Sequence, residues 1–157
     1  MIATMVDGTL LMDIVIDQDA TLPSYAHEND AGMDLVASKD TVLTAFKPEA
    51  VPTGIKVAIP IGCEGQVRPR SGLSLKGVTV YNSPGTIDAG FRSEVKVILM
   101  YIPPNDDSSL PSATFEIKKG DRIAQLIISE CARVTLNPVS SLDETERGEN
   151  GFGSSGV

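Results

Sequence analysis

The sequence predicts an all-β fold, a jelly-roll β-barrel or sandwich with at most one short helix and a mobile C-terminal tail. Short segments rich in β-branched residues recur along the chain, with turn-forming residues between them. Ten prolines and fourteen glycines supply these breaks. No stretch of the sequence carries the sustained apolar stripe of an amphipathic helix. Many short strands between frequent turns are typical of antiparallel barrels and sandwiches.

Five segments are expected to form strands, because each is a short run of Val, Ile and Leu near turn residues. In chain order they are LLMDIVI from Leu10, VLTAF from Val42, GIKVAI from Gly54, EVKVILMYI from Glu94 and RIAQLII from Arg122. The fourth is apolar on both alternating faces, which predicts a strand buried by its own sheet and by another subunit. One or two helical turns behind a serine cap are expected in SGLSLKG, from Ser71.

The chain of 157 residues has the length of one domain. We expect a single β domain over residues 1–146 and a flexible lid segment over residues 147–157 that belongs to the same domain. This tail, RGENGFGSSGV, holds four glycines and two serines. Glycine loses the most conformational entropy on ordering, so the tail is expected to stay mobile unless a ligand orders it. By composition alone, a flexible linker is the simpler interpretation.

Charge and hydropathy exclude several functions. A net charge of −8 argues against nucleic acid as a partner, because a duplex binder needs a basic face. No apolar run approaches the roughly eighteen residues of a membrane span, and the acidic start lacks the basic region of a signal peptide. We therefore expect no membrane contact and a cytoplasmic location. A nucleotide remains compatible, since a triphosphate brings magnesium that neutralises much of its charge.

The cysteines and the single histidine offer little chemistry. Cys63 and Cys131 lie far apart in the sequence without a CxxC spacing, so a zinc site built with His27 is not expected. Both cysteines are expected to be small buried apolar residues. A Ser-His-Asp mechanism would need His27, which has no nucleophile motif nearby.

Five short islands concentrate Gly, Asp, Arg, Ser and Gln. They are AGMDL from Ala31, PRSGLSLKG from Pro69, NSPGTIDAGFRSEVKV from Asn82, GDRIAQLI from Gly120, and the tail. Each island alone has an ordinary interpretation as a turn, a helix cap or a hairpin.

Two islands suggest chemistry from their residues. Arg70, Ser71 and Gly72 would place a guanidinium, a hydroxyl and backbone N–H groups at a helix start, which suits an anion. The GxxxxGK[ST] spacing of a Walker loop is absent. The amide of Asn82 could read the edge of a base. The carboxylate of Asp88 could take a proton from an attacking water, or simply bond the backbone of its own turn.

In this order and spacing, the five islands resemble the five motifs of the trimeric deoxyuridine triphosphatases (dUTPases), from about Met12 to the C-terminus. The resemblance implies a jelly-roll homotrimer that hydrolyses dUTP to dUMP and pyrophosphate with Mg²⁺. This activity would limit uracil in DNA and supply dUMP for thymidylate synthesis. It also implies that each active site takes motifs from three subunits, the last being the mobile tail of a neighbour.

The resemblance also implies roles for individual residues. Asp34 would hold hydrated magnesium indirectly, through water. The phosphates would be bound by Arg70, Ser71, Gly72 and Gln125, with Arg122 in support. Uracil would lie against Asn82, Thr86, Ile87 and Lys96. Asp88 would bind the sugar 3′-hydroxyl and activate the attacking water, while Phe91 would lie under the deoxyribose. In the tail, Phe152 would stack on uracil, and the residues closing on the β- and γ-phosphates would be Arg147, Gly153, Ser154 and Ser155.

Three positions depart from the family pattern. Phe91 stands where the family usually has tyrosine, so the ring that excludes a ribose remains but the phenol is lost. Ser93 and Asn150 stand where glycine is usual, which affects loop geometry and removes no catalytic group.

Two alternatives were weighed. The related dCTP deaminases share the fold but carry a glutamate on the strand after the aspartate, and this chain has Ile98 near that place. A regulatory binding protein of the same fold would be expected to lose the aspartate or the tail, and this chain keeps both. A regulatory partner in addition to catalysis stays open, and the loop from Pro103 to Pro111 is the expected place for it.

Overall fold

The computed structural model describes residues 5–6, 8–104, 112–146 and 148 of the chain. The all-β prediction is confirmed, with one helix among the described residues, α1 (Ser71–Ser74). The first strands are β1 (Met5–Val6), β2 (Thr9–Leu10), β3 (Asp13–Ile16), β4 (Met33–Val36), β5 (Thr41–Thr44), β6 (Glu49–Pro52) and β7 (Ile55–Ala58). The later strands are β8 (Cys63–Arg68), β9 (Val78–Val80), β10 (Gly85–Ile87), β11 (Lys96–Tyr101), β12 (Thr114–Ile117) and β13 (Arg122–Glu130).

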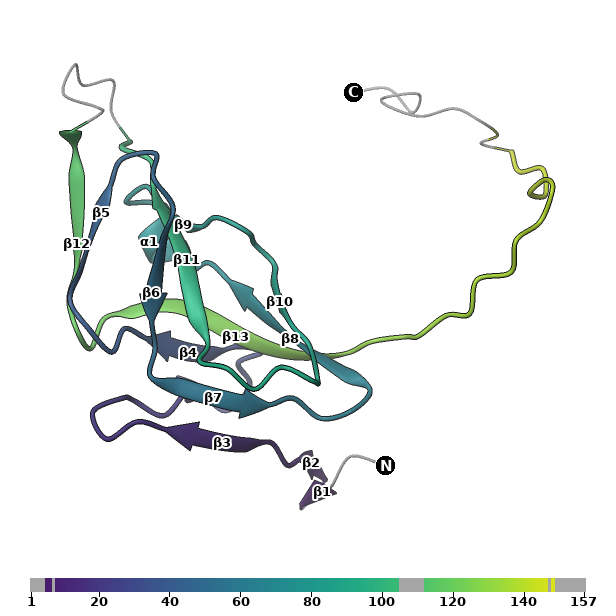
Figure 1. The fold of residues 1–157 in the computed structure, drawn as a ribbon, viewed down its shortest axis with the longest axis horizontal. Helices are drawn as coiled ribbons and strands as arrows, with labels where there is room; N and C mark the ends of the chain where they lie inside the picture. Colours follow the sequence, from purple (N-terminus) through teal and green to yellow (C-terminus); the bar gives the residue numbers. More distant parts are fainter. Residues whose placement is uncertain (1–4, 7, 105–111, 147, 149–157) are drawn as a thin grey trace.

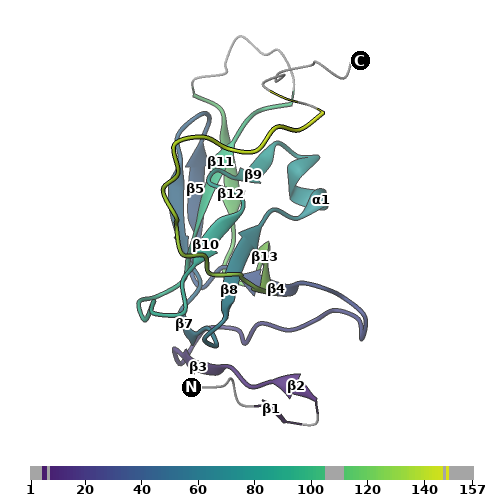
Figure 2. The same ribbon diagram turned by 90° about the vertical axis from the view of Figure 1, so that its right-hand side faces the viewer.

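The strands pair into small antiparallel sheets that wrap around one core (Figures 1 and 2). The largest has the order β10-β8-β13-β4, and a second has the order β6-β11-β9. The remaining pairs are β12-β5, β3-β7 and β1-β2. The strand β13 lies between β8 and β4, so it places Gln125 opposite both Arg68 and Asp34. This pairing brings together three islands that are distant in the sequence.

All five segments expected to be strands contain one, as β3, β5, β7, β11 and β13. The serine cap predicted for α1 is wrong. Ser71 is the first helical residue, the N-cap is Arg70, and that side chain makes no cap hydrogen bond. The carbonyl of Arg70 instead accepts the N–H groups of Leu73 and Ser74 at 3.1 and 3.0 Å.

Aliphatic side chains fill the core. On β11, Val97 and Leu99 are fully buried while Ile98 and Met100, on the other face, are only partly buried. One face of this strand is therefore in the core of its own chain. The second face keeps part of its apolar surface open, and its predicted burial by another subunit stays a prediction.

The two cysteines differ. Cys63 is buried, and its burial, with the nearby Glu130 and Cys131, raises the pKa of the thiol. Cys131 is exposed, so the prediction that both are buried is wrong for this residue. The reason is that Cys131 lies just beyond β13, where the chain leaves the sheet.

After β13 the chain leaves the body of the molecule as an extended segment (Figure 1). All of residues 131–146 are exposed, including the apolar side chains Val134, Leu136, Val139 and Leu142. We call residues 131–146 the C-terminal arm. Within the described part of the chain, no helix is long and apolar enough to cross a membrane.

Candidate active site

Three islands meet around one polar cavity of about 500 Å³, here called the polar pocket. Its lining residues are Ala26, Asp30, Ala31, Gly32, Asp34, Arg70, Ser71, Gly72 and Gln125. Four of the residues predicted to bind phosphates, and the residue predicted to hold magnesium through water, thus lie together. Asp30 also lines this cavity, although the motif comparison assigned it no role.

The polar pocket is organised by the carboxylate of Asp34, which lies on β4. Its Oδ1 is 2.9 Å from Nε of Arg70, and its Oδ2 is 3.2 Å from Nη1 of Arg122. The Asp34 side chain is only 15% exposed and that of Arg70 29%, so this pair is shielded from water more than a surface pair would be, whereas the Arg122 side chain is 56% exposed. Nη1 of Arg70 also donates to the carbonyl of Arg122 at 3.3 Å. Both guanidinium groups are therefore held in place before any anion binds.

Gln125 joins the same islands through neutral contacts. Its Nε2 donates to the carbonyl of Pro69 at 2.9 Å, directly before the Arg70 to Gly72 loop. A Cβ added to Gly32 would lie 2.6 Å from Oε1 of Gln125, so glycine is needed for this close approach. The first N–H donors within α1 belong to Leu73 and Ser74. The N–H groups of Ser71 and Gly72 therefore precede the helical hydrogen bonds, and backbone donors at such a position can bind an anion.

A second, smaller cavity of about 110 Å³ lies beside β10. We call it the hairpin pocket because a hairpin is the ordinary interpretation of the NSPGTIDAGF sequence, although β10 pairs with the distant strand β8 and not with a neighbour in the sequence. Its lining residues are Val67, Asn82, Gly85, Thr86, Ile87, Phe91, Val95, Lys96 and Ile98. Four residues predicted to lie against uracil are among them, Asn82, Thr86, Ile87 and Lys96, together with Phe91, predicted to lie under the sugar. The volume is close to that of a cavity that holds one benzene-sized ring.

The walls of the hairpin pocket are close-packed. A Cβ added to Gly85 would lie 3.0 Å from Nδ2 of Asn82, which leaves the glycine backbone directly against this amide. Ile98, near the place of the glutamate in the deaminases, contributes an apolar wall. The pocket therefore combines one amide with a tight apolar surface.

Asp88 follows β10 and lines neither of the two pockets. Its side chain is exposed, and its carbonyl accepts the N–H of Phe91 at 3.0 Å in a turn. Nη1 of Arg92 donates to the carbonyls of Ala89 and Phe91, both at 2.7 Å. The turn that presents Asp88 is thus held by Arg92, a residue that the motif comparison left without a role.

The five predicted tail residues, Arg147, Phe152, Gly153, Ser154 and Ser155, lie outside the described residues, as does most of the Pro103 to Pro111 loop. The polar pocket and the hairpin pocket have no lining residue in common. No group of three His, Cys, Asp or Glu side chains among the described residues is placed to hold a metal ion directly.

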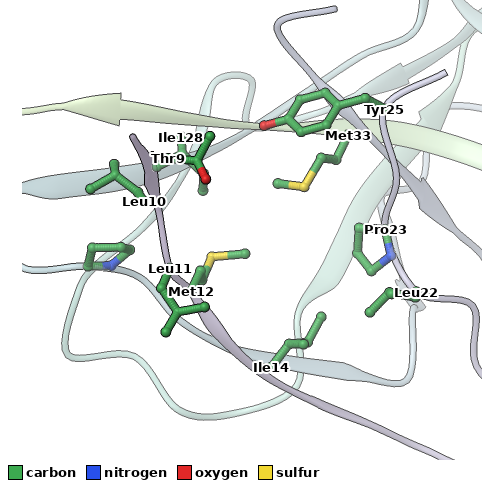
Figure 3. Close-up of a pocket in the computed structure, with 11 residues that line it drawn as sticks. Thr9, Leu10, Leu11, Met12, Ile14, Leu22, Pro23, Tyr25, Met33 and Ile128 are labelled. Atoms are coloured by element: carbon green, nitrogen blue, oxygen red, sulfur yellow. The ribbon is translucent and has the colours of Figure 1, made fainter. Parts of the chain in front are cut away.

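A third cavity, of about 600 Å³, has no lining residue in common with these two pockets (Figure 3). Its walls are Thr9, Leu10, Leu11, Met12, Ile14, Leu22, Pro23, Tyr25, Met33, Pro60 and Ile128, none of them charged. We call it the apolar groove. The motif comparison did not predict it, because it carries no catalytic residue types. The signal in the sequence is the cluster of large apolar residues from Leu10 to Ile14.

The fold and the two pockets define an antiparallel β protein with a charged pocket suited to an anion and a smaller, largely apolar pocket. The chain belongs to the dUTPase family, whose model matches residues 18–156. A deoxyuridine 5′-triphosphate nucleotidohydrolase of Clostridium tetani is 44% identical over 153 residues, covering 97% of this chain and 99% of the relative. One of Rickettsia felis is 50% identical over 140 residues, covering 87% of this chain and 89% of the relative.

Solved structures agree with this assignment. The dUTPase of Staphylococcus bacteriophage 80alpha, solved with dUPNHPP, is similar with a TM-score of 0.84 and 29% identity. The match covers 95% of this chain and 100% of the phage chain. A mutant dUTPase of phage phi11, which coordinates a structural Mg(II) ion, has a TM-score of 0.74 at 23% identity and covers 83% of this chain and 97% of that chain. This last likeness shows the fold.

Proposed function

We propose that this chain hydrolyses dUTP to dUMP and pyrophosphate. The observation that carries the proposal is the division of the site into an anion pocket, organised by Asp34, Arg70 and Arg122, and a ring-sized pocket with the Asn82 amide. A nucleoside triphosphate needs both. The family relatives named deoxyuridine 5′-triphosphate nucleotidohydrolase support this substrate.

In the proposed reaction the base enters the hairpin pocket and the phosphates enter a polar pocket. Asp88 accepts a proton from a water whose oxygen attacks the α-phosphorus. The bond from that phosphorus to the bridging oxygen breaks, so pyrophosphate leaves and dUMP remains. A general base of this kind contributes about 10²–10⁴-fold. Positioning of the reactants and stabilisation of charge by Arg70 and its neighbours supply the rest.

The polar pocket fits magnesium that arrives with the triphosphate. Mg²⁺ keeps several waters and is usually bound through substrate phosphates with one or two carboxylates. Both oxygens of Asp34 already accept guanidinium groups, so this carboxylate suits a contact through water better than a direct bond. When bound, the ion would neutralise charge on the phosphates, while Arg70 and the N–H groups of Ser71 and Gly72 orient them.

We further propose a homotrimer in which the polar pocket of one subunit meets the hairpin pocket of another. Within one chain these pockets share no lining residue, which supports a site completed by a neighbour. Two unsatisfied apolar surfaces support assembly: the C-terminal arm, with Leu136 and Leu142 each more than four-fifths exposed, and the uncharged apolar groove. Burying such surface is the main driving force of association.

The tail, residues 147–157, is proposed to be a lid over the nucleotide in a neighbouring subunit. The arm that precedes it leaves the body of its own chain (Figure 1). In this proposal Phe152 covers uracil, and Arg147 with Ser154 and Ser155 closes on the terminal phosphates. Closure of this kind excludes water and completes a site.

One assay tests these proposals. Pyrophosphate release is measured from dUTP, dTTP, dCTP and UTP, with the full chain and with a chain ending at Glu146. We expect strong preference for dUTP and a large loss on truncation. Equal turnover of the four nucleotides, or release of ammonia from dCTP, would contradict the proposed activity, and unchanged turnover after truncation would contradict the lid. Light scattering then checks the mass of a trimer.

A further inference from the structure

Glu94 does not line the hairpin pocket, but it binds the segment that does, Val95 and Lys96, to another part of the fold. Val95 and Lys96 both line the cavity, and Glu94 comes directly before them. Glu94 is not a lining residue, and its side chain is only 27% exposed. The Glu94 carboxylate therefore contacts other residues of the protein more than it contacts water.

The Glu94 carboxylate bridges two parts of the fold. Its Oε1 accepts the backbone N–H of Gly54 at 2.9 Å, and its Oε2 lies 3.8 Å from Nζ of Lys96. The first contact joins residues forty positions apart and is partly buried. A hydrogen bond from an amide to a buried carboxylate is stronger than one between neutral groups.

The turn at Gly54, whose N–H binds Glu94, is held in place by its own packing. Gly54 has a φ of +70°, and a Cβ there would lie 2.6 Å from Cβ of Ala20, so only glycine fits. Its carbonyl accepts the N–H of Asp17 at 2.9 Å. The position of this turn is therefore fixed by packing that does not involve the hairpin pocket.

Thr53 makes a second link between the same two segments. It is 1% exposed, and its hydroxyl donates to the carbonyl of Val95. The N–H of Val95 donates in turn to the carbonyl of Ile55 at 2.8 Å. Both polar groups of the Val95 backbone are thus bound to the two residues that flank Gly54.

We propose that Glu94 is a positioning residue that, together with Thr53, sets the width of the hairpin pocket and so its selectivity for an unmethylated pyrimidine. This inference rests on the proposed function. A pocket of about 110 Å³ leaves little room beyond one ring, so a small outward shift of Val95 and Lys96 would admit an added methyl group. Loss of the Gly54 contact removes the restraint on that shift.

The test compares Glu94→Ala, Glu94→Gln and Thr53→Val by kcat and KM for dUTP and dTTP. For Glu94→Ala we expect kcat/KM for dUTP to fall about tenfold, mainly through KM, as for loss of one charge-assisted hydrogen bond. The ratio of kcat/KM for dTTP to that for dUTP should rise. Glu94→Gln keeps an oxygen for Gly54 N–H and should restore the ratio, since the half-exposed Lys96 pair contributes little.

Glu116→Ala is the matched control. Glu116 lies on β12, outside the hairpin pocket, and its exposed carboxylate pairs with Lys118 at 3.0 Å. If Glu94 and Thr53 had a purely structural role, Glu94→Ala and Thr53→Val would lower the melting temperature and leave the ratio of kcat/KM for dTTP to that for dUTP unchanged. That result would overturn the proposal. If Glu94→Ala does not fold, Thr53→Val, which preserves side-chain shape, tests the proposal by the same ratio of kcat/KM values. Absence of dUTP turnover by the unsubstituted chain would instead refute the proposed function, and this inference with it.

Discussion

The polar pocket and the hairpin pocket are built in different ways. The polar pocket is made by charged and amide side chains from three separate islands, held by the Asp34 ion pairs and by Gln125. The hairpin pocket is made largely by one continuous segment, from Asn82 to Ile98, which includes β10 and the start of β11, with close-packed walls and a single amide from Asn82. Charge binds any polyphosphate, whereas a tight fixed wall distinguishes one base from another. We therefore expect binding strength and base selectivity to be separable in this molecule.

The largest effect is expected at Asp88, which lines neither pocket and is the proposed general base. Asp88→Asn keeps the shape and removes the base, so kcat should fall about 10²–10⁴-fold. Binding of a non-hydrolysable dUTP analogue, measured by calorimetry, should change little. Asp13→Asn, an exposed acid on β3, serves as control. Near-normal turnover in Asp88→Asn would remove Asp88 from the proposed role.

Arg70 tests the polar pocket. Arg70→Gln removes the guanidinium that pairs with Asp34 and leaves this carboxylate with Arg122 alone. Loss of charged hydrogen bonds worth about 1.5–3 kcal/mol should raise KM for dUTP about ten- to hundredfold, without changing the dTTP to dUTP ratio.

The control for Arg70 is Arg68→Gln, because Arg68 is exposed, bonds only to Gln66 among the described contacts, and lines neither pocket. A changed base preference in Arg70→Gln would break the separation between the two pockets.

Gly32→Ala tests the packing that supports the polar pocket. The new Cβ would meet the Gln125 amide at 2.6 Å, so Gln125 must move and weaken its bond to Pro69. We expect the free energy of unfolding to fall by about 1–3 kcal/mol, with a several-fold increase in KM. Gly90→Ala is the control for stability, because its added Cβ meets nothing within 4 Å. Equal unfolding midpoints for the two variants would contradict this packing argument.

The smallest effect is expected from salt. Raising ionic strength from about 0.05 to 0.5 M screens exposed charges, so KM for dUTP should rise a few-fold. Inhibition by deoxyuridine, which lacks phosphates and would use only the hairpin pocket, should stay constant. If salt reduced the affinities for dUTP and for deoxyuridine equally, charge would not act through the polar pocket alone.

Much of this could be predicted from the sequence. The strands β3, β5, β7, β11 and β13 were expected because runs of Val, Ile and Leu between turns favour extended backbone whatever they pair with. The strand β8, CEGQVR, was not among them, because a short polar segment with a glycine becomes a strand only between two partners. The grouping of Arg70, Ser71, Gly72 and Gln125 was also expected, since the motifs carry it.

Other features depend on contacts that no local pattern contains. The ion pairs of Asp34, the Gln125 bond to Pro69 and the Glu94 bond to Gly54 join distant residues, and the order of the strands decides them. The exposure of Cys131 depends on where β13 ends.

The sequence by itself therefore determined the fold class, the family and the residue types available for chemistry, because these follow from local preference and motif spacing. Only the tertiary structure decided that the polar pocket and the hairpin pocket are separate cavities within one chain, that both oxygens of Asp34 pair with guanidinium groups, and that Glu94 accepts a hydrogen bond from the N–H of Gly54. The physical reason is that hydrogen bonds and ion pairs act over a few ångströms, and folding alone brings distant residues to that range.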